Sequence, residues 1–118
     1  MATCYRHCPY SKTMDGTMAN FIVTFRLKSD STYAYRYESF VERIQHIAPE
    51  WIWEETSSFY AFEAEGTAES ICDDIYYNSS FNEATDSLVV IDLGKRKSFT
   101  RGVIESPARL KFCLGFYE

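Results

Sequence analysis

Four cysteines and two histidines are the side chains of this sequence best suited to bind a transition metal. Cys4 and Cys8 flank His7, but no second Cys/His pair follows at the spacing of a zinc site. Cys72 falls on the apolar face of a predicted helix, and Cys113 lies in an apolar segment near the end of the chain. The spacing therefore predicts free thiols, no metal site and no cofactor.

Candidate acids and nucleophiles also lack a catalytic arrangement. The pairs Glu54–Glu55 and Asp73–Asp74 are neighbours in the sequence, and adjacent side chains diverge on both helices and strands. Ser58 lies in a polar bend, where a hydroxyl normally bonds to nearby backbone. Asp30 and Asp92 follow or end predicted strands, and a metal site shared across a dimer is the less favoured alternative to solvated carboxylates. The residue types alone leave the catalytic residues unknown.

Charge is distributed unevenly along the chain, whose formal net charge is −5. No Lys or Arg lies between Arg43 and Lys95, a stretch that holds eleven acidic residues. From Lys95 to Lys111 six basic residues face only Glu105. Such a split predicts an acidic face and a basic face. The basic segment is expected mainly to meet the acidic one, in the same chain or a second copy, and binding to nucleic-acid phosphate is the alternative.

The elements that must position these residues follow from apolar periodicity. Alternation predicts a strand over 20–27, and a three-to-four-residue repeat predicts a helix over 31–48 with Ser31 or Thr32 as its cap. The stripe on that helix contains Tyr33, Tyr37 and Phe40, and Arg36 falls outside it. The remaining predicted elements are two strands within 51–64 separated by a polar bend at 54–58, a helix over 67–78 capped by Thr67, a strand over 87–93 and a short strand over 98–104.

This order, β-α-β-β-α-β, predicts an α+β fold: a ferredoxin-like two-layer sandwich with an extra C-terminal strand or tail. We expect residues 1–17 to be an N-terminal extension or tag-like segment that is poorly ordered. Residues 18–104 form the predicted ferredoxin-like domain, and residues 105–118 form a tail. A length of 118 residues suits one domain. The sequence has neither a long apolar run nor a secretory signal, so we expect a cytoplasmic protein with no membrane partner.

A two-layer domain leaves one face of its sheet without helices, and an exposed apolar face is typical of a partner or a dimer. The aromatic content of 17% is high for one small core. We therefore expect a homodimer in which the C-terminal segment packs across the interface. The side chains expected to supply the apolar area are Leu110, Phe112, Leu114 and Phe116.

Residues 18–102 resemble the small ferredoxin-like proteins known as SinR-like, which are similar to the CRISPR-associated Cas-two endonucleases and the VapD-type ribonucleases. The resemblance lies in the segment 18–27 (MANFIVTFRL), in Ser58-Phe59-Tyr60, in 86–93 (DSLVVIDL) and in 99–102 (FTRG). It implies a homodimer. The nuclease relatives carry, within a Tyr-Asp-Leu type triplet at the end of strand one, an Asp associated with metal-dependent cleavage. The matching triplet here is Phe25-Arg26-Leu27, and a guanidinium repels a metal cation.

Three functional hypotheses follow. The first is a non-catalytic interaction or regulatory module that is homodimeric and has a possible protein partner. The second is a nucleic-acid-binding protein or a degenerate metal-dependent endonuclease. The third is an acidic nucleic-acid mimic that inhibits a partner. The residues expected to contact nucleic acid under the second hypothesis are Arg26, Ser58, Lys95, Arg96, Lys97 and Arg101.

Overall fold

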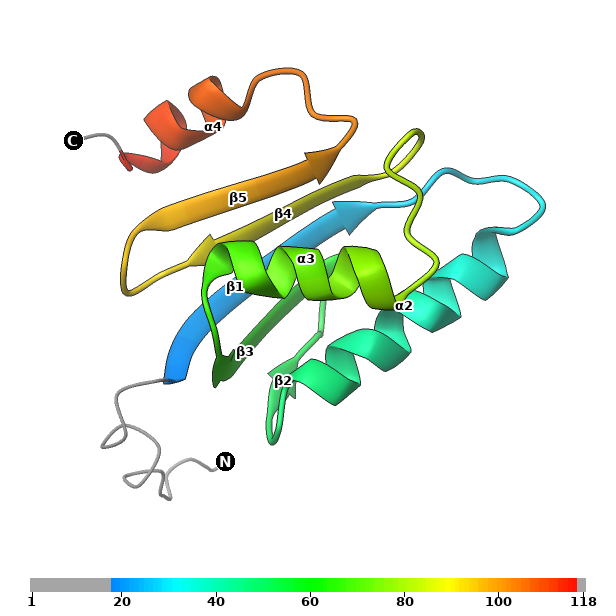
Figure 1. Cartoon of the computed structure of the whole chain (residues 1–118), viewed down its shortest axis with the longest axis horizontal. Coiled ribbons are helices and arrows are strands. Elements are labelled where there is room, and N and C mark those ends of the chain that lie inside the picture. The colour runs from blue at the N-terminus through cyan, green and yellow to red at the C-terminus, as the bar shows by residue number, and fades with distance from the viewer. Residues whose placement is uncertain (1–17, 117–118) are drawn as a thin grey trace.

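A computed structural model describes residues 18–116, which form one antiparallel sheet and three helices (Figure 1). The strands lie in the order β2-β3-β1-β4-β5, and every neighbouring pair is antiparallel. In chain order the elements are β1 (Met18–Arg26), α2 (Tyr33–Ile47), β2 (Ile52–Trp53), β3 (Phe59–Glu65), α3 (Ala68–Asn78), β4 (Ser87–Asp92), β5 (Lys97–Gly102) and α4 (Pro107–Leu114). The predicted α+β class is therefore confirmed, and the extra strand is present as β5.

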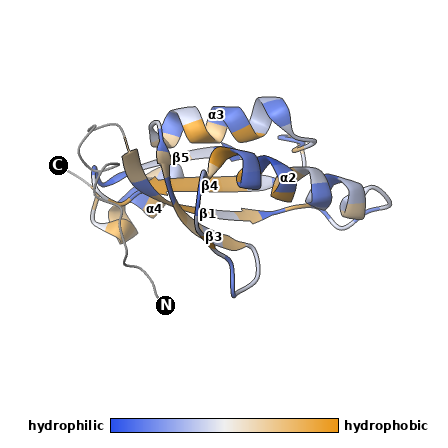
Figure 2. Ribbon diagram, turned by 90° about the horizontal axis from the view of Figure 1, so that it is seen from below, coloured by the Kyte–Doolittle hydropathy of each residue, from blue (hydrophilic) through white to orange (hydrophobic). Residues whose placement is uncertain are grey.

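The core lies between the sheet and the helices α2 and α3, which cover the same face (Figure 2). β1 is the central strand: Val23 lies opposite Tyr60 of β3 and Val90 of β4. Alternate side chains of these strands point toward the helices, so one face of the sheet is buried and the other is half-buried. Phe40, a member of the predicted stripe on α2, is buried against this face at 0% exposure, and Ile71 of α3 is buried there at 3%.

The two covering helices begin in different ways. α3 begins with a capping box in which the Thr67 hydroxyl accepts a hydrogen bond from the Ser70 N–H, as expected for this cap. The N-cap residue of α2 is Thr32, one of the two residues predicted, but its side chain makes no capping bond. The Thr32 hydroxyl and N–H instead donate to the Asp30 carboxylate at 2.9 and 3.0 Å. These bonds hold the pKa of Asp30 below its usual value, the hydroxyl contributing most.

The apolar stripe predicted on α2 is wrong at its N-terminal end. Tyr33 and Tyr37 are both 38% exposed, while Arg36, expected outside the stripe, is 7% exposed. The sequence could not show this, because the group that allows a guanidinium to be buried here is Asp86, fifty residues further along the chain. Farther along α2, Phe40 is buried as predicted, and Ile44, one turn later, is buried as well.

The segment expected to be a tail contains α4. Its sequence signals are local: the Ser106 hydroxyl accepts a hydrogen bond from the Arg109 N–H, Pro107 occupies the first turn, and Gly115 ends the helix with φ 77°. α4 runs beside β5, on the opposite side of that strand from α3 (Figures 1 and 2). None of its residues is buried.

The predicted N-terminal extension, residues 1–17, lies outside the described residues, and so do Cys4, His7 and Cys8. Within residues 18–116 the longest helix is α2, with 15 residues, and no helix has the length and apolarity to cross a membrane.

Candidate functional site

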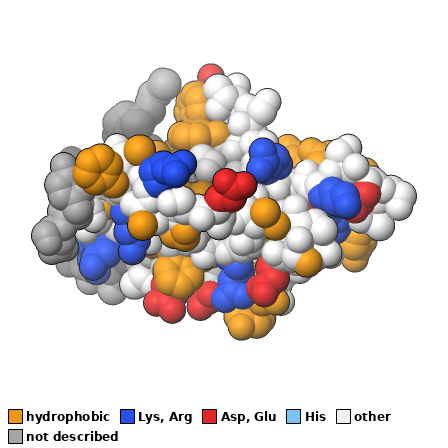
Figure 3. Space-filling view, turned by 90° about the horizontal axis from the view of Figure 1, so that it is seen from above, with side chains coloured by type: hydrophobic (Ala, Val, Ile, Leu, Met, Phe, Trp, Pro, Cys, Tyr) orange, Lys and Arg blue, Asp and Glu red, His pale blue; other side chains and the backbone are white. Residues whose placement is uncertain are grey.

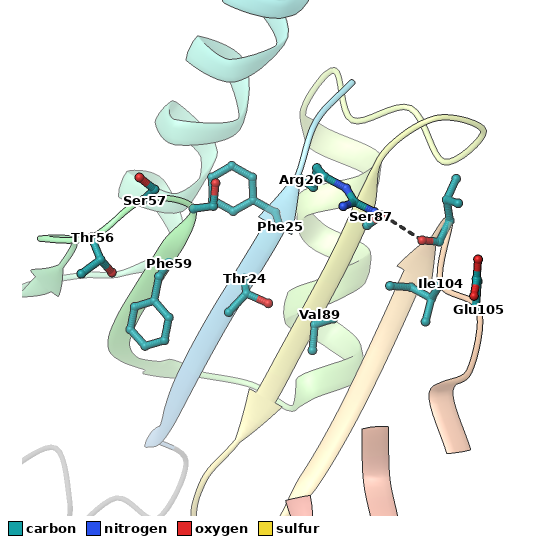
Figure 4. Close-up of a pocket in the computed structure, with 12 residues that line it drawn as sticks. Thr24, Phe25, Arg26, Thr56, Ser57, Phe59, Ser87, Val89, Ile104 and Glu105 are labelled. Carbon is teal, nitrogen blue, oxygen red and sulfur yellow. Dashed lines mark hydrogen bonds between the residues drawn. The ribbon is translucent and has the colours of Figure 1, made fainter. Parts of the chain in front are cut away.

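A groove of about 620 Å³ opens on the sheet face that α2 and α3 leave uncovered (Figure 4). It lies where β1 ends and where β3 and β4 begin, so three central strands form its floor. Its walls come from two loops, the bend before β3 and the segment after β5. The residues that line it are Thr24, Phe25, Arg26, Thr56, Ser57, Ser58, Phe59, Ser87, Val89, Val103, Ile104 and Glu105.

Arg26 and Ser58, two of the residues expected to contact nucleic acid, both line this groove. Arg26 is the last residue of β1, its side chain is exposed, and it forms no ion pair with any residue in the range 18–116. Ser58 has a left-handed backbone with φ 54°, a conformation that costs energy for a residue other than glycine. Its carbonyl accepts a hydrogen bond of 3.3 Å from the Phe25 N–H, which ties the bend to β1.

The groove combines hydroxyl groups with an apolar surface. Thr24, Thr56 and Ser57 line it together with Ser58, and Phe59, Val89 and Ile104 supply carbon surface. The hydroxyl of Ser87 donates to the Val103 carbonyl at 2.8 Å, which fixes the segment after β5 against β4. Figure 4 shows Arg26 next to Ser87, and Glu105 on the far side of Ile104. The groove therefore contains the guanidinium of Arg26, and the carboxylate of Glu105 is separated from it by Ile104.

A buried ion pair lies on the helix-covered side of the same end of the sheet. Asp86, at the start of β4, is fully buried, and its carboxylate accepts a short hydrogen bond from the Arg36 guanidinium of α2. The other Asp86 bonds come from the N–H groups of Lys28 and Asn82 at 2.8 and 2.9 Å and from the Thr85 hydroxyl at 3.1 Å. Both carboxylate oxygens therefore have partners, as a buried charge requires.

The guanidinium of Arg36 is equally well satisfied. It donates to the Lys28 carbonyl at 2.7 Å and to the Thr32 hydroxyl at 3.0 Å, and Asp30 lies 3.4 Å away. This cluster joins the loop after β1, helix α2 and the loop before β4. It was not predicted from the sequence, because its members are distant in the chain and none belongs to a motif. Its role is to hold the strand ends that form the groove.

The close packing of β5 at this point requires a glycine. Gly102 has φ 92°, and a Cβ there would lie 2.0 Å from the Asp86 carbonyl oxygen. That same oxygen accepts a hydrogen bond of 2.8 Å from the Val103 N–H. The absence of a side chain at Gly102 therefore lets the segment that carries Ile104 and Glu105 turn toward the groove.

Arg101, another predicted nucleic-acid contact, does not reach the groove. It lies on the helix-covered side, where its guanidinium carbon is 4.0 Å from the ring centre of Tyr76. It is 3.1 Å from carboxylate oxygens of both Asp73 and Glu83. Arg101 thus joins the basic segment to the acidic one within a single chain, which is one of the two pairings that the charge pattern left open.

Lys95, Arg96 and Lys97 are at the opposite end of the sheet from Arg26. Arg96 has φ 56°, donates to the Gly115 carbonyl and lies 5.1 Å from the ring centre of Phe116, so it binds the end of α4. Lys95 and Lys97 line a separate hollow together with Lys111. Figure 3, which looks onto the β5 and α4 edge, shows basic side chains spaced apart among apolar and acidic ones. The predicted nucleic-acid contacts therefore do not form one continuous surface.

The titratable groups of the described chain offer little for catalysis. No three His, Cys, Asp or Glu residues within 18–116 lie close enough to hold a metal ion. Asp92 is buried and accepts a hydrogen bond of 3.0 Å from the Lys95 N–H, which closes the turn after β4. Cys72 and Cys113 are free thiols, and burial raises the pKa of Cys72 to about 12. A thiol with this pKa is not a nucleophile at neutral pH.

Comparisons with protein-family models, curated proteins and solved structures return no match for this chain. Two features of the described chain are open to another molecule: a groove with an exposed guanidinium at one end of the sheet, and helix α4 along its edge, of which no residue is buried.

Proposed function

We propose that this protein is a non-catalytic interaction module with a ferredoxin-like fold, and that it acts as a homodimer. The single observation that carries the proposal is α4, a helix of eight residues of which none is buried within the chain. It carries Leu110, Leu114 and Phe112, the last of which is 70% exposed. Apolar side chains collected on one short helix are typical of a surface that a partner covers.

The strand order supports the ferredoxin-like part of the proposal. The first four strands lie in the order β2-β3-β1-β4, with α2 between β1 and β2 and α3 between β3 and β4. Both helices pack on the same face of the sheet. This is the arrangement expected of a β-α-β-β-α-β chain, to which β5 and α4 add a further edge.

The non-catalytic part of the proposal is supported by Arg26. The position at which the resemblance implies a metal-binding Asp carries a guanidinium, and no cluster of three ligand side chains compensates for it within residues 18–116. Mg²⁺ requires oxygen ligands. We therefore expect no cleavage of DNA or RNA in the presence of Mg²⁺ or Mn²⁺.

The geometry of α4 refines the expected interface. Leu110 and Leu114 are four residues apart and share one side of the helix, whereas Phe112 lies on another side. Val103, after β5, and Leu93, after β4, are also about half exposed. Apolar contacts must supply most of the association energy, because ion pairs at the rim of an interface contribute roughly 0–1 kcal/mol each.

Light scattering coupled to size exclusion tests the dimer. The intact chain should have twice the mass of one chain, and it should keep that mass at about 0.5 M salt, which screens charges beyond a few ångströms. The double variant Leu110→Glu, Phe112→Glu and a chain that lacks residues 108–118 should both have the mass of one chain.

A matched control is Tyr35→Glu, which places a new charge on α2 at a side chain that is 68% exposed in the single chain. This variant should remain dimeric. A single-chain mass for the intact protein, or an unchanged dimer after deletion of residues 108–118, would contradict the proposed interface. A nuclease assay with both metals, in which EDTA and an Arg26 substitution serve as controls, tests the non-catalytic part separately.

A further inference from the structure

We propose that the groove beside Arg26 binds a small organic phosphate whose body is apolar or aromatic. Arg26 is at the rim of a hollow, and it forms no ion pair with any other residue of the described chain. By contrast, Arg36, Arg43 and Arg101 all pair with carboxylates.

Hydroxyl groups line the groove together with the Arg26 guanidinium. A guanidinium presents N–H groups in a planar fork that matches a phosphate in two-point contact. Thr24 of β1 and Ser58 of the bend before β3 line the same groove and add hydroxyl groups to it. A phosphate dianion offers three terminal oxygens to such a set, one more than a carboxylate has. The donor set therefore favours phosphate.

The remainder of the groove includes apolar side chains. Phe59 and Val89 extend from β3 and β4 on the same face, and Ile104 lies across from them (Figure 4). A volume of about 620 Å³ is within the range of small-molecule sites and exceeds what a phosphate ion needs. A ligand that fills it would place its charge at Arg26 and a ring or aliphatic body on these three side chains.

The groove is also rigid enough to bind without rearrangement. Its floor is made of paired strands, and the Arg36–Asp86 ion pair fixes the loops behind it. The left-handed backbone of Ser58 is held by its bond to the Phe25 N–H. Strained residues of this kind collect at functional sites, where the surrounding structure holds them in place.

Glu105 limits affinity and offers an internal test. Its carboxylate lines the same groove, although Figure 4 places it beyond Ile104 from Arg26. A carboxylate at that wall disfavours an anion through the like-charge interaction. Removal of the Glu105 charge should therefore strengthen the binding of a phosphate. The same change should leave the binding of an uncharged ligand unaltered.

The experiment is amide NMR titration of the full chain with phenyl phosphate at low salt. We expect shifts at Thr24, Arg26, Ser58 and Ser87, with a Kd in the millimolar range or below. Arg26→Gln should weaken binding roughly tenfold to a hundredfold, the range for loss of a charged hydrogen-bond donor. Glu105→Gln should strengthen it about twofold. Inorganic phosphate should bind roughly tenfold more weakly, because it has no apolar body.

The matched control is Lys28→Gln, which removes the same charge from an exposed side chain two residues beyond Arg26. It should change the Kd less than about twofold. Equal weakening by Arg26→Gln and Lys28→Gln would overturn the proposal, as would shifts centred on Lys95 and Lys97. Phenol that binds as well as phenyl phosphate would also overturn it. This result is independent of the dimer. If the protein is a single chain in solution and binds phenyl phosphate, the phosphate site is supported and the homodimer is contradicted.

Discussion

On the helix-covered face of the sheet Arg36 is buried and bonded to the Asp86 carboxylate, whereas on the open face Arg26 is exposed in a groove without an ion-pair partner among residues 18–116. Both arginines are at the same end of the sheet. The two faces therefore use the same chemical group for different purposes. On one side the charge holds the fold together, and on the other it remains available to a ligand.

The contrast extends to the helices. α3 is capped at its start and buries Ala68, Ile71, Cys72 and Ile75, while α4, on the opposite side of β5, buries none of its residues. A charge or an apolar side chain with a full set of partners inside the chain explains stability. An exposed charge or an exposed apolar side chain that borders a hollow or an edge is where the proposals above place another molecule.

The largest expected effect comes from Asp86→Ala. This change leaves the Arg36 guanidinium buried without its carboxylate and removes the acceptor for the Lys28 and Asn82 N–H groups. Loss of one member of a buried pair costs about 3–5 kcal/mol. Urea unfolding at neutral pH should show a fall of this size in the free energy of unfolding.

Arg26, on the sheet face that α2 and α3 leave uncovered, provides the comparison for Asp86→Ala. Arg26→Gln should change the free energy of unfolding by less than about 0.5 kcal/mol, because an exposed side chain without a partner contributes little. The double variant Arg36→Met, Asp86→Leu should be more stable than Asp86→Ala, since it leaves no buried charge. If Arg26→Gln destabilised the chain as much as Asp86→Ala, the distinction between the two faces would be wrong.

A smaller effect, of opposite sign, is expected at Ser58. Glycine adopts φ 54° without steric cost, so Ser58→Gly should raise the free energy of unfolding by about 0.5–1 kcal/mol. Ser57→Gly is the control: its φ is not positive, so added backbone freedom in the unfolded chain should lower stability. Thermal unfolding of both variants measures the difference, and equal destabilisation would show that the bend stores no strain.

The smallest effect on the free energy of unfolding at neutral pH is expected from the thiol of Cys72, one of the two free cysteines of the described chain. Burial raises the pKa of Cys72 to about 12, so the folded state holds this proton more tightly than the unfolded state does. The contribution of Cys72 to stability is therefore complete below about pH 9 and is lost as the pH rises toward 12.

Alkylation at pH 8 with peptide mapping separates the two thiols. Cys113, which is exposed on α4 in the single chain, should react faster than Cys72, which should react only after the chain unfolds in urea. If α4 is covered by a second copy of the chain, as proposed above, the Leu110→Glu, Phe112→Glu variant should expose Cys113 further. Rapid alkylation of Cys72 in the folded protein would contradict its place in the core.

Local patterns in the sequence were sufficient for most of the secondary structure. Alternation along β1 and the repeat on α3 predicted the side chains that are buried, because periods of two and 3.6 residues fix which face a side chain occupies. The cap at Thr67 could also be predicted from the sequence, because its hydrogen-bond partner, Ser70, lies only three residues away. α4 was missed although Ser106, Pro107 and Gly115 form a local signal, because its weak apolar repeat was interpreted as a tail.

Only the tertiary structure decided which charges have partners. Arg36 and Arg26 look alike in the sequence, and the difference between them is a carboxylate fifty residues from Arg36 that the sheet brings beside α2. Likewise, Arg26 and Ser58 line one groove because β1 pairs with β3, whereas the pairing of β4 with β1 and β5 places Lys95 and Lys97 at the far end of the sheet. Periodicity is a property of neighbouring residues. The burial and pairing of a charge depend on strand register and loop packing, which only the folded chain defines.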